Sequence, residues 1–295
     1  MAEGNTAVVT DSTVYMPPEF LAANDIQTVS LYVTLDGEQR RESEISAEAY
    51  DDFYERLRAS EEGASTSQPS VGDFTSVYEP LLAAGREIVS IHISAGISGT
   101  IGSALQARKE LVDSGSGGER IHVWDSRSGC GGQGLMALIA GQASVNGDDA
   151  EQVVAKVERA RATLKMWFAI DTLEYLRRGG RIGAAQAFLG SALQIKPILT
   201  LEEEITPVER VRTRRRAFER MVEYARERSE ASAGTWVVQH IHDPETARRL
   251  VEAGREVFGS EPAFVSQIGP VIGAHVGPGL LGIGGIETGL LRLGD

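Results

Sequence analysis

Two hydroxyl residues, Ser98 and Thr100, flank Gly99 at the end of the segment SAGISGT, residues 94–100. This segment separates an apolar run at 88–93, which predicts a buried strand, from a helical spacing that begins at Ile101. A strand that enters a helix through such a turn leaves backbone N–H groups free at the helix N-terminus, where an anion is favoured. Ser98 is therefore the first candidate ligand contact, although a plain helix-capping role for it also fits.

A second pair of hydroxyl residues, Thr66 and Ser67, opens the segment TSQPS at 66–70. Pro69 favours an extended backbone before it, and Ser70 with Asp73 matches the capping box of a following helix. Chain geometry thus explains the end of the segment but not its first two residues. We expect Thr66 and Ser67 on an exposed, extended loop, with their hydroxyls available to a ligand.

Polar residues also follow two further predicted strands. Asp11 and Ser12 come directly after the strand at 7–10, and DSRSGCGGQG at 125–134 follows the strand at 121–124, with a helix predicted from about Leu135. Carboxyl ends of parallel strands meet at one edge of a sheet, where open α/β folds bind their ligands. Asp11 and Ser12 are therefore candidates for the same crevice, and an ordinary turn is the alternative.

The second half of the chain offers two candidates beside glycines. Arg181 follows Gly179 and Gly180, which suit the end of a short helix. After a predicted last strand at 264–268, the stretch at 269–289 has eight glycines in 21 residues and carries His275. Such density predicts a loop whose backbone approaches another group closely. His275 is a candidate for that site, and a structural histidine is the alternative.

A basic cluster stands out on an acidic chain. Its members are Arg210, Arg212, Arg214, Arg215 and Arg216, at the start of a predicted helix. Cations are unfavourable at a helix N-terminus, so the cluster suggests a docking surface for phosphate or an acidic partner. A solvated helix start is the alternative.

Bulk composition narrows the function classes. The 295 residues include 42 acidic and 29 basic ones, for a net charge of −13, which argues against general nucleic-acid binding and adhesion to anionic membranes. No apolar run approaches the ~18 residues of a membrane helix, and the first residues lack a secretion signal. With one cysteine, Cys130, we expect a cytoplasmic protein without disulfides.

Motifs of self-sufficient catalysts are missing from the sequence. It contains no P-loop, HExxH, paired-cysteine or GxSxG motif. Its five histidines are dispersed, so neither a metal site nor a cofactor is expected. The chain is predicted to bind a ligand rather than to be a complete enzyme.

Alternating strand and helix signals up to about residue 160 predict a parallel sheet. Strands at 195–201 and 208–211, separated by an acidic turn, indicate a hairpin and therefore a mixed sheet in the second half. We expect an α/β protein of two domains, residues 1–164 and 165–295.

Taken in order, these segments resemble the DegV family from end to end. The segments that carry the resemblance are TDST (10–13), TSQPS (66–70), SGT (98–100), DSRSGCGGQG (125–134), TLEYLRRGGRIG (172–183), LQIKPIL (193–199), VRTRRRA (211–217) and GPVIGAHVGPG (269–279). Members of the family are similar to fatty-acid-binding subunits of the bacterial fatty acid kinase system. Their fold is two α/β domains that hold the lipid between or beneath them.

The resemblance implies roles for particular residues. Thr66 and Ser98 would hold the fatty-acid carboxylate, and His275 and Arg181 would lie near the head group. Arg212 matches the region that meets an ATP-dependent kinase subunit.

Two departures from the family pattern are mild. Ala95 stands where a second serine is common, and Cys130 stands where small residues are usual and would alter the tail pocket.

The main hypothesis is therefore a carrier that buries a long-chain fatty acid and presents its carboxyl group to a separate kinase for conversion to acyl phosphate. A second hypothesis is a binder of a small polar metabolite, similar to dihydroxyacetone kinase subunits in which a histidine holds the substrate. A third is a hydrolase with Ser98 as nucleophile and His275 as base.

Overall fold

Four parallel strands form the first sheet, in the order β2-β1-β6-β7. In this computed structural model, which describes residues 5–189 and 195–291, they are β1 (Thr6–Asp11), β2 (Ile26–Val29), β6 (Glu87–His92) and β7 (Ile121–Asp125). β1 is buried along its whole length, as expected for an inner strand covered on both faces. The parallel sheet predicted for the first half of the chain is confirmed.

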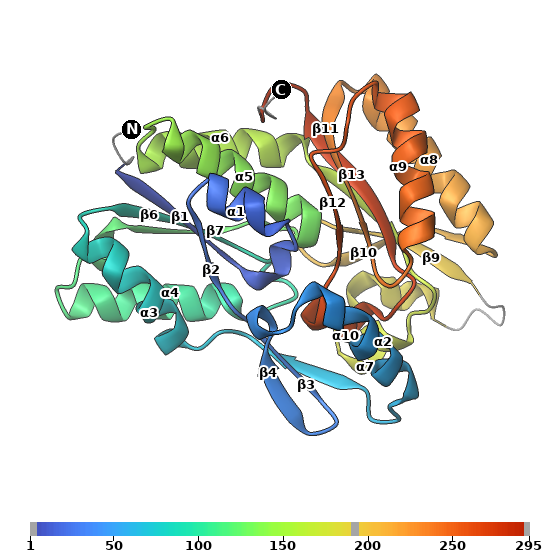
Figure 1. Cartoon of the computed structure of the whole chain (residues 1–295), viewed down its shortest axis with the longest axis horizontal. Coiled ribbons are helices and arrows are strands. Elements are labelled where there is room, and N and C mark those ends of the chain that lie inside the picture. Colours follow the sequence, from blue (N-terminus) through green and yellow to red (C-terminus); the bar gives the residue numbers. More distant parts are fainter. Residues whose placement is uncertain (1–4, 190–194, 292–295) are drawn as a thin grey trace.

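Helices cover both faces of this sheet (Figure 1). α3 (Val71–Ala83) and α4 (Thr100–Asp113) pack on one face, and α5 (Cys130–Val145) and α6 (Ala150–Thr163) pack on the other. α3 begins at the capping box of Ser70 and Asp73 that the sequence predicts. α6 has a capping box of the same kind, formed by Asp149 and Gln152.

α5 contacts both main sheets, and nearly all of its residues are buried. It begins at Cys130, so the prediction of a helix start near Leu135 is wrong by five residues. Glycines in its first turn allow close packing: a Cβ on Gly131 would lie 2.8 Å from Val237, and one on Gly132 would lie 2.2 Å from the Ser128 hydroxyl. These glycines, which indicated a loop, are part of a tightly packed helix.

The second sheet is mixed, with the order β10-β9-β8-β13-β11-β12. Its strands are β8 (Lys165–Ala169), β9 (Lys196–Leu201), β10 (Ile205–Val211), β11 (Ala233–His240), β12 (Phe264–Gln267) and β13 (Leu281–Glu287). β9 and β10 form the predicted antiparallel hairpin, and β11 and β12 are parallel. α8 (Arg214–Glu230) and α9 (Pro244–Phe258) contact this sheet. Residues 193 and 194 of the LQIKPIL segment lie outside the described residues.

The Gly-rich stretch at 269–289 is not a loop, and 264–268 is not the last strand. The stretch forms α10 (Pro270–Val276) and then β13, which lies between β8 and β11 inside the sheet. A Cβ on Gly284 would lie 2.3 Å from the Lys165 carbonyl oxygen, and one on Gly285 equally close to that of Thr235. The glycines thus let neighbouring backbones approach closely, as predicted, but they do so in a strand rather than in a loop.

A third sheet, which the sequence did not predict, is formed by β3 (Tyr32–Leu35), β4 (Glu38–Arg41) and β5 (Ala64–Ser67). α2 (Tyr50–Ala59) follows a short 3₁₀ turn after Ser46 and buries an apolar face formed by Phe53, Tyr54 and Leu57. Thr66 and Ser67 therefore lie on a strand; their predicted extended conformation is right, but the predicted loop is wrong.

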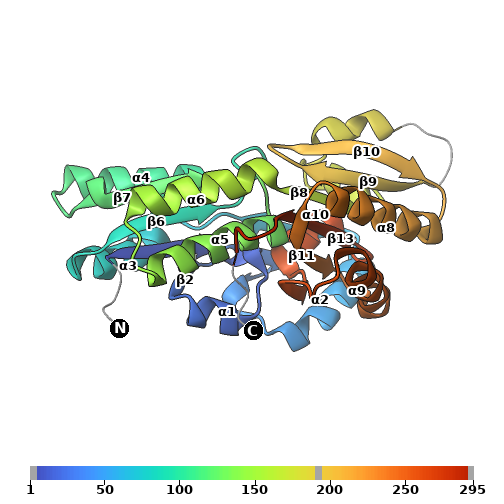
Figure 2. The same cartoon turned by 90° about the horizontal axis from the view of Figure 1, so that it is seen from above.

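The two main sheets lie at opposite ends of the long axis of the molecule (Figure 2). The predicted division between 164 and 165 falls between α6 and β8. One hydrophobic cluster crosses this division, since it joins Val8 and Val89 to Val237 and Phe264. The division into two domains stays a prediction.

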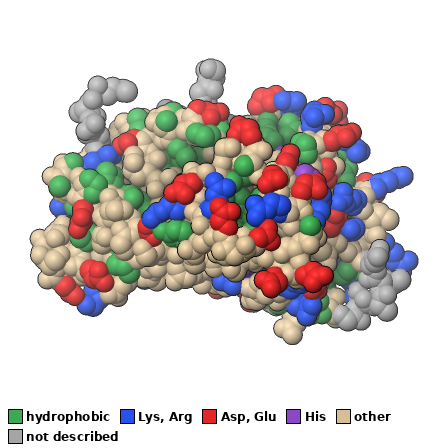
Figure 3. Space-filling model, turned by 60° about the horizontal axis from the view of Figure 1, so that its bottom comes forward, with side chains coloured by type: hydrophobic (Ala, Val, Ile, Leu, Met, Phe, Trp, Pro, Cys, Tyr) green, Lys and Arg blue, Asp and Glu red, His purple; other side chains and the backbone are tan. Residues whose placement is uncertain are grey.

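Charged side chains of both signs are interspersed on the face shown in Figure 3. Over the described part of the chain, no helix combines the length and apolar character needed to cross a membrane. Within the same residues, His, Cys, Asp and Glu form no group of three that could hold a metal ion.

Candidate functional site

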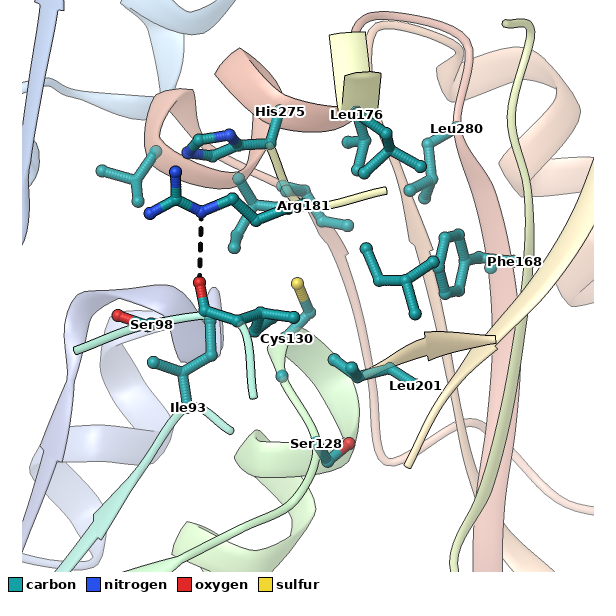
Figure 4. A pocket seen from close by; sticks show the side chains of 18 of the residues that line it. Ile93, Ser98, Ser128, Cys130, Phe168, Leu176, Arg181, Leu201, His275 and Leu280 are labelled. Carbon is teal, nitrogen blue, oxygen red and sulfur yellow. Dashed lines mark hydrogen bonds between the residues drawn. The ribbon is translucent and has the colours of Figure 1, made fainter. Parts of the chain in front are cut away.

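A cavity opens between the two halves of the chain, and both halves contribute to its wall (Figure 4). It encloses about 1020 Å³ of space free of protein atoms, counting its open mouth. Aliphatic and aromatic side chains form most of the wall: Leu31, Ile93, Ile97, Met166, Trp167, Phe168, Leu176, Leu201, Ile205, Ile268, Val271, Ile272, Val276 and Leu280. Such a wall suits a long apolar group.

Polar side chains gather on one side of this cavity. In Figure 4, His275, Arg181 and Ser98 lie on one side, and Phe168, Leu201 and Leu280 lie on the other. Thr66 joins the polar side, because its hydroxyl oxygen lies 2.7 Å from Nε2 of His275. The cavity thus combines an apolar wall with one cluster of hydrogen-bonding groups, which we call the polar cluster: Thr66, Ser98, Arg181 and His275.

Thr66 is placed in the polar cluster by β5. Its neighbour across the sheet is Val33 of β3, and strand alternation leaves Ser65 and Ser67 exposed while Thr66 is half-buried. Ser67 also lines the cavity. Strand pairing therefore fixes the direction of the Thr66 hydroxyl more firmly than the predicted loop would have done.

His275 lies in the last turn of α10 and packs directly on the backbone of Gly179. A Cβ on Gly179 would lie 2.2 Å from Nδ1 of His275, and this nitrogen finds no hydrogen-bond partner among the described residues. Burial, and next the positive charge of Arg181, lower the pKa of His275 to about 4. The imidazole is therefore neutral near pH 7, with Thr66 as its hydrogen-bonding neighbour.

Arg181 follows α7 (Glu174–Arg178) and the two glycines after it. Its guanidinium donates to the carbonyl oxygens of Gly179, at 2.7 Å, and Ile97, at 3.3 Å. These two carbonyls hold the side chain across the mouth of the cavity without neutralising its charge. Arg181 therefore gives the polar cluster a positive charge.

Ser98 lies in the turn between β6 and α4. Its hydroxyl is 2.8 Å from that of Thr100 and accepts a hydrogen bond from the Thr100 backbone N–H at 3.3 Å. Ser98 thus satisfies a group at the start of α4 and also lines the cavity, so the capping and ligand-contact interpretations are compatible. His275 contacts Thr66 rather than Ser98, and this geometry gives no support to a Ser98–His275 catalytic pair.

The turn that carries Ser98 is braced by the β9–β10 hairpin. Ser94 donates from its hydroxyl to the Glu203 carbonyl oxygen at 2.6 Å. A Cβ on Gly96 would lie 2.1 Å from the same oxygen. This close approach explains the glycine in the SAGISGT segment.

Asp11 and Ser12 lie outside the cavity lining, contrary to expectation. Asp11 is fully buried and accepts hydrogen bonds from Thr13 and the Ile93 backbone N–H, with His92 as a third neighbour. Ser12 donates to a carboxylate oxygen of Glu42 at 2.6 Å. Both residues hold the end of β1 in place, and their position near a bound head group stays a prediction.

The basic cluster lies on the surface of the second half. Arg214 is paired with Asp171, and Arg215 and Arg216 are paired with Glu219. Arg212 is exposed and forms no ion pair within the described part of the chain. Most of the cluster is thus neutralised by its own helix or by Asp171, and its docking role stays a prediction for Arg212 and Arg214.

Three polar residues of the cavity wall were not proposed as ligand contacts from the sequence. Gln68 lines the mouth, where its amide lies against Gly99, and Ser128 and Gln239 line the wall. Gln68 lies in the TSQPS segment that the sequence analysis singled out, but Pro69 accounted for its extended conformation, so no ligand contact was assigned to it. Ser128 belongs to the DSRSGCGGQG segment that the sequence placed at the end of a strand beside the crevice, although it was not named as a contact, and nothing in the sequence marked Gln239.

Cys130, which departs from the family pattern described above, also lines the cavity. Burial, and next the charges of Glu42 and Asp11, raise the pKa of its thiol well above the ordinary value. The thiol therefore stays protonated and acts as an apolar part of the wall.

Comparison with known proteins gives consistent matches over nearly the whole chain. A family model described as "Uncharacterised protein, DegV family" matches residues 5–288. Protein DegV of Bacillus subtilis is 37% identical over 284 residues, which cover 95% of this chain and 98% of that protein. A DegV domain-containing protein of Streptomyces coelicolor is 37% identical over 283 residues, covering 95% and 97%.

Solved structures agree with this match. The crystal structure of B. subtilis DegV, described as a fatty acid binding protein, has a TM-score of 0.85 at 35% identity, and covers 97% of this chain and 100% of that one. A DegV family protein from Thermus thermophilus, described for its fatty acid binding, has a TM-score of 0.82 at 32% identity, covering 96% and 99%. With the same two-sheet architecture and end-to-end sequence matches, the chain belongs to the DegV family.

Proposed function

We propose that this chain binds a long-chain fatty acid, with the tail along the apolar wall and the carboxylate at the polar cluster. The observation that carries the proposal is the distribution of the lining: apolar side chains form most of the wall, and the polar cluster lies on one side of it. Thr66 and Ser98 would donate from their hydroxyls to the carboxylate, and Arg181 would add a positive charge. The fatty acid binding of the two similar solved proteins supports this assignment.

The tail would provide most of the affinity. Burial of a chain of ~15 methylenes contributes about 12 kcal/mol at ~0.8 kcal/mol each, and association and ordering offset a large part of this. The carboxylate needs donors, because burying it unpaired would cost several kcal/mol. Hydroxyl donors such as Thr66 and Ser98 satisfy the carboxylate while leaving an oxygen able to accept a phosphoryl group.

The role we infer is that of a carrier for a separate ATP-dependent kinase, which would convert the presented carboxyl group to an acyl phosphate. Phosphoryl transfer requires a nucleotide cradle and Mg²⁺, and the sequence carries no nucleotide-binding motif of the P-loop type. Arg212 supports a partner surface on this chain, because it is exposed and unpaired among the described residues. The kinase would provide the catalytic groups, and this chain would provide the substrate.

The two other hypotheses have less support. A small polar metabolite would leave most of the apolar wall uncovered, which is unfavourable for a site of this size. A hydrolase would need Ser98 within reach of a general base, whereas His275 contacts Thr66.

Mass spectrometry under denaturing conditions tests lipid binding directly. We expect a long-chain acid to co-purify in about equimolar amount, and delipidated protein to take up added palmitate or oleate. Dihydroxyacetone and butyrate serve as competitors that share only the small polar part of the ligand. No co-purifying acid and no uptake would refute the proposal, and displacement by dihydroxyacetone would favour the polar-metabolite hypothesis.

The partner surface is tested by Arg212→Glu. We expect the variant to retain its lipid and to lose reaction with the kinase, because a repulsive charge would face the partner. Arg248→Glu, on another helix, is the charge-matched control. Loss of lipid in Arg212→Glu would place this residue at the cavity instead, and unchanged phosphorylation would remove it from the docking surface.

A further inference from the structure

The helix that carries His275 begins without a cap of its own. Gly269 precedes α10 and has no side chain to accept its first N–H groups, and Pro270 has no N–H. The next two N–H groups are bonded by residues from the other half of the chain: Val271 donates to Oε1 of Glu42 at 2.8 Å, and Ile272 donates to the Tyr15 hydroxyl at 3.1 Å. A distant acid–phenol pair thus replaces the local cap.

Glu42 and Tyr15 form one unit at the start of α10. The Tyr15 hydroxyl donates to Oε1 of Glu42 at 2.7 Å, while Ser12 donates to Oε2. Glu42 is 2% exposed, and no cation is paired with it among the described residues. Burying a carboxyl group that meets only neutral donors costs free energy. Its presence in the interior therefore indicates a specific structural role for Glu42.

A second phenol holds the same chain segment. Tyr54 donates from its hydroxyl to the Ile268 carbonyl oxygen at 2.6 Å, directly before α10. A Cβ on Gly273 would lie 2.3 Å from the Tyr54 hydroxyl. Tyr54, from the first half of the chain, therefore contacts both the segment before α10 and one side of the helix.

His275 lies one helical turn after Val271, so its position depends on where α10 begins. On its other side it is held by Thr66, at 2.7 Å from Nε2, and by the backbone of Gly179. A shift of the start of α10 would carry the imidazole along the helix direction and alter the distance to Thr66. Seven residues give the helix few other bonds to resist such a shift.

We propose that Glu42 is a positioning residue for the polar cluster: paired with Tyr15, it fixes the start of α10 and thereby sets His275 against Thr66. The inference rests on the proposed fatty-acid site for its functional meaning. It assigns a role to a buried acid that lies outside the cavity lining and touches no ligand.

Glu42→Ala and Glu42→Gln separate positioning from charge. Glutamine has the same shape, and its carbonyl oxygen accepts from Val271 and Tyr15, whereas alanine leaves both without an acceptor. Tyr15→Phe removes the hydroxyl that accepts from the Ile272 N–H and keeps the aromatic ring. Asp149→Ala, which removes the cap of α6 at an exposed site outside the cavity lining, is the control for general destabilisation.

Two measurements are combined: the affinity of delipidated protein for oleate, and the imidazole nitrogen chemical shifts of His275. We expect Glu42→Ala to weaken binding about fivefold to tenfold, the equivalent of one lost hydrogen bond, and to shift the His275 signals. Tyr15→Phe should give a smaller change of the same kind. Glu42→Gln and Asp149→Ala should keep the wild-type affinity and signals.

Unchanged His275 signals in Glu42→Ala and Tyr15→Phe would overturn the inference. Equal weakening by Asp149→Ala would also overturn it, because general stability would then explain the effect. If the wild type binds no oleate, the proposed function fails, and the His275 signals alone decide whether Glu42 positions the helix.

Discussion

Thr66→Val is the most direct test of how the polar cluster meets a carboxylate. Valine keeps the β-branched shape that suits β5 and removes only the hydroxyl, which lies 2.7 Å from His275. A hydrogen bond to a charged group contributes about 1.5–3 kcal/mol, which corresponds to roughly a 10- to 150-fold change in affinity. We expect a loss toward the lower end, because the site is open at its mouth and water replaces part of the lost bond.

Delipidated protein titrated with oleate gives the dissociation constant of each variant, with a fluorescent fatty acid as the displaced probe. Ser65→Ala is the matched control, since it removes a hydroxyl from the same strand at an exposed position beside Thr66. Control and wild type should agree. An affinity for oleate that changes by less than about twofold in Thr66→Val, well below the weight of one charge-assisted bond, would refute the assignment of Thr66 to the carboxylate.

Three other perturbations act on the interior. Burial raises the pKa of Glu42 from 4.5 to about 7, so between these pH values this group binds more protons in the folded state than in the unfolded chain, and its contribution to stability falls as pH rises. The lowered pKa of His275 acts in the opposite direction over the same range, so the wild type is compared with Glu42→Gln by urea unfolding at about pH 5 and pH 8. The wild type should lose ~2–3 kcal/mol of stability relative to the variant, and parallel changes in the two proteins would contradict this. Gly179→Ala would place a methyl group against His275 and should weaken oleate binding roughly tenfold. Its control is Gly180→Ala, at φ +69° with open space around it, which should cost ~1 kcal/mol of stability without changing the affinity for oleate. Equal affinities of the two variants would contradict the assignment of His275 to the site. Leu280→Trp fills part of the tail wall and should shift preference toward shorter acids in a competition experiment, a shift that must be absent if the tail lies elsewhere.

Local signals predicted much of the scaffold. The capping box at Ser70 and the alternating apolar run before SAGISGT indicated α3 and β6 correctly, because capping and periodicity depend on neighbouring residues. The hairpin of β9 and β10 was predicted for the same reason. Thr66, Ser98, Arg181 and His275, which come from four separate segments, all line one cavity.

Non-local packing explains the errors. β13 was not predicted because Gly282, Gly284 and Gly285 weaken a strand locally, and only the neighbouring backbones show why they are needed there. The start of α5 was hidden for the same reason. Asp11 and Ser12 looked available to a ligand, but their partners His92 and Glu42 come from other segments whose approach no local pattern indicates.

The brace between the β9–β10 turn and the Ser94–Gly96 segment has a consequence for sequence change in relatives of this chain. Tips of surface hairpins ordinarily accept added or deleted residues with little effect. Here the Glu203 carbonyl lies directly against Gly96, two residues before Ser98, so a longer or shorter tip would displace the polar side of the cavity. Hairpin length should therefore vary little among homologues that keep the polar cluster.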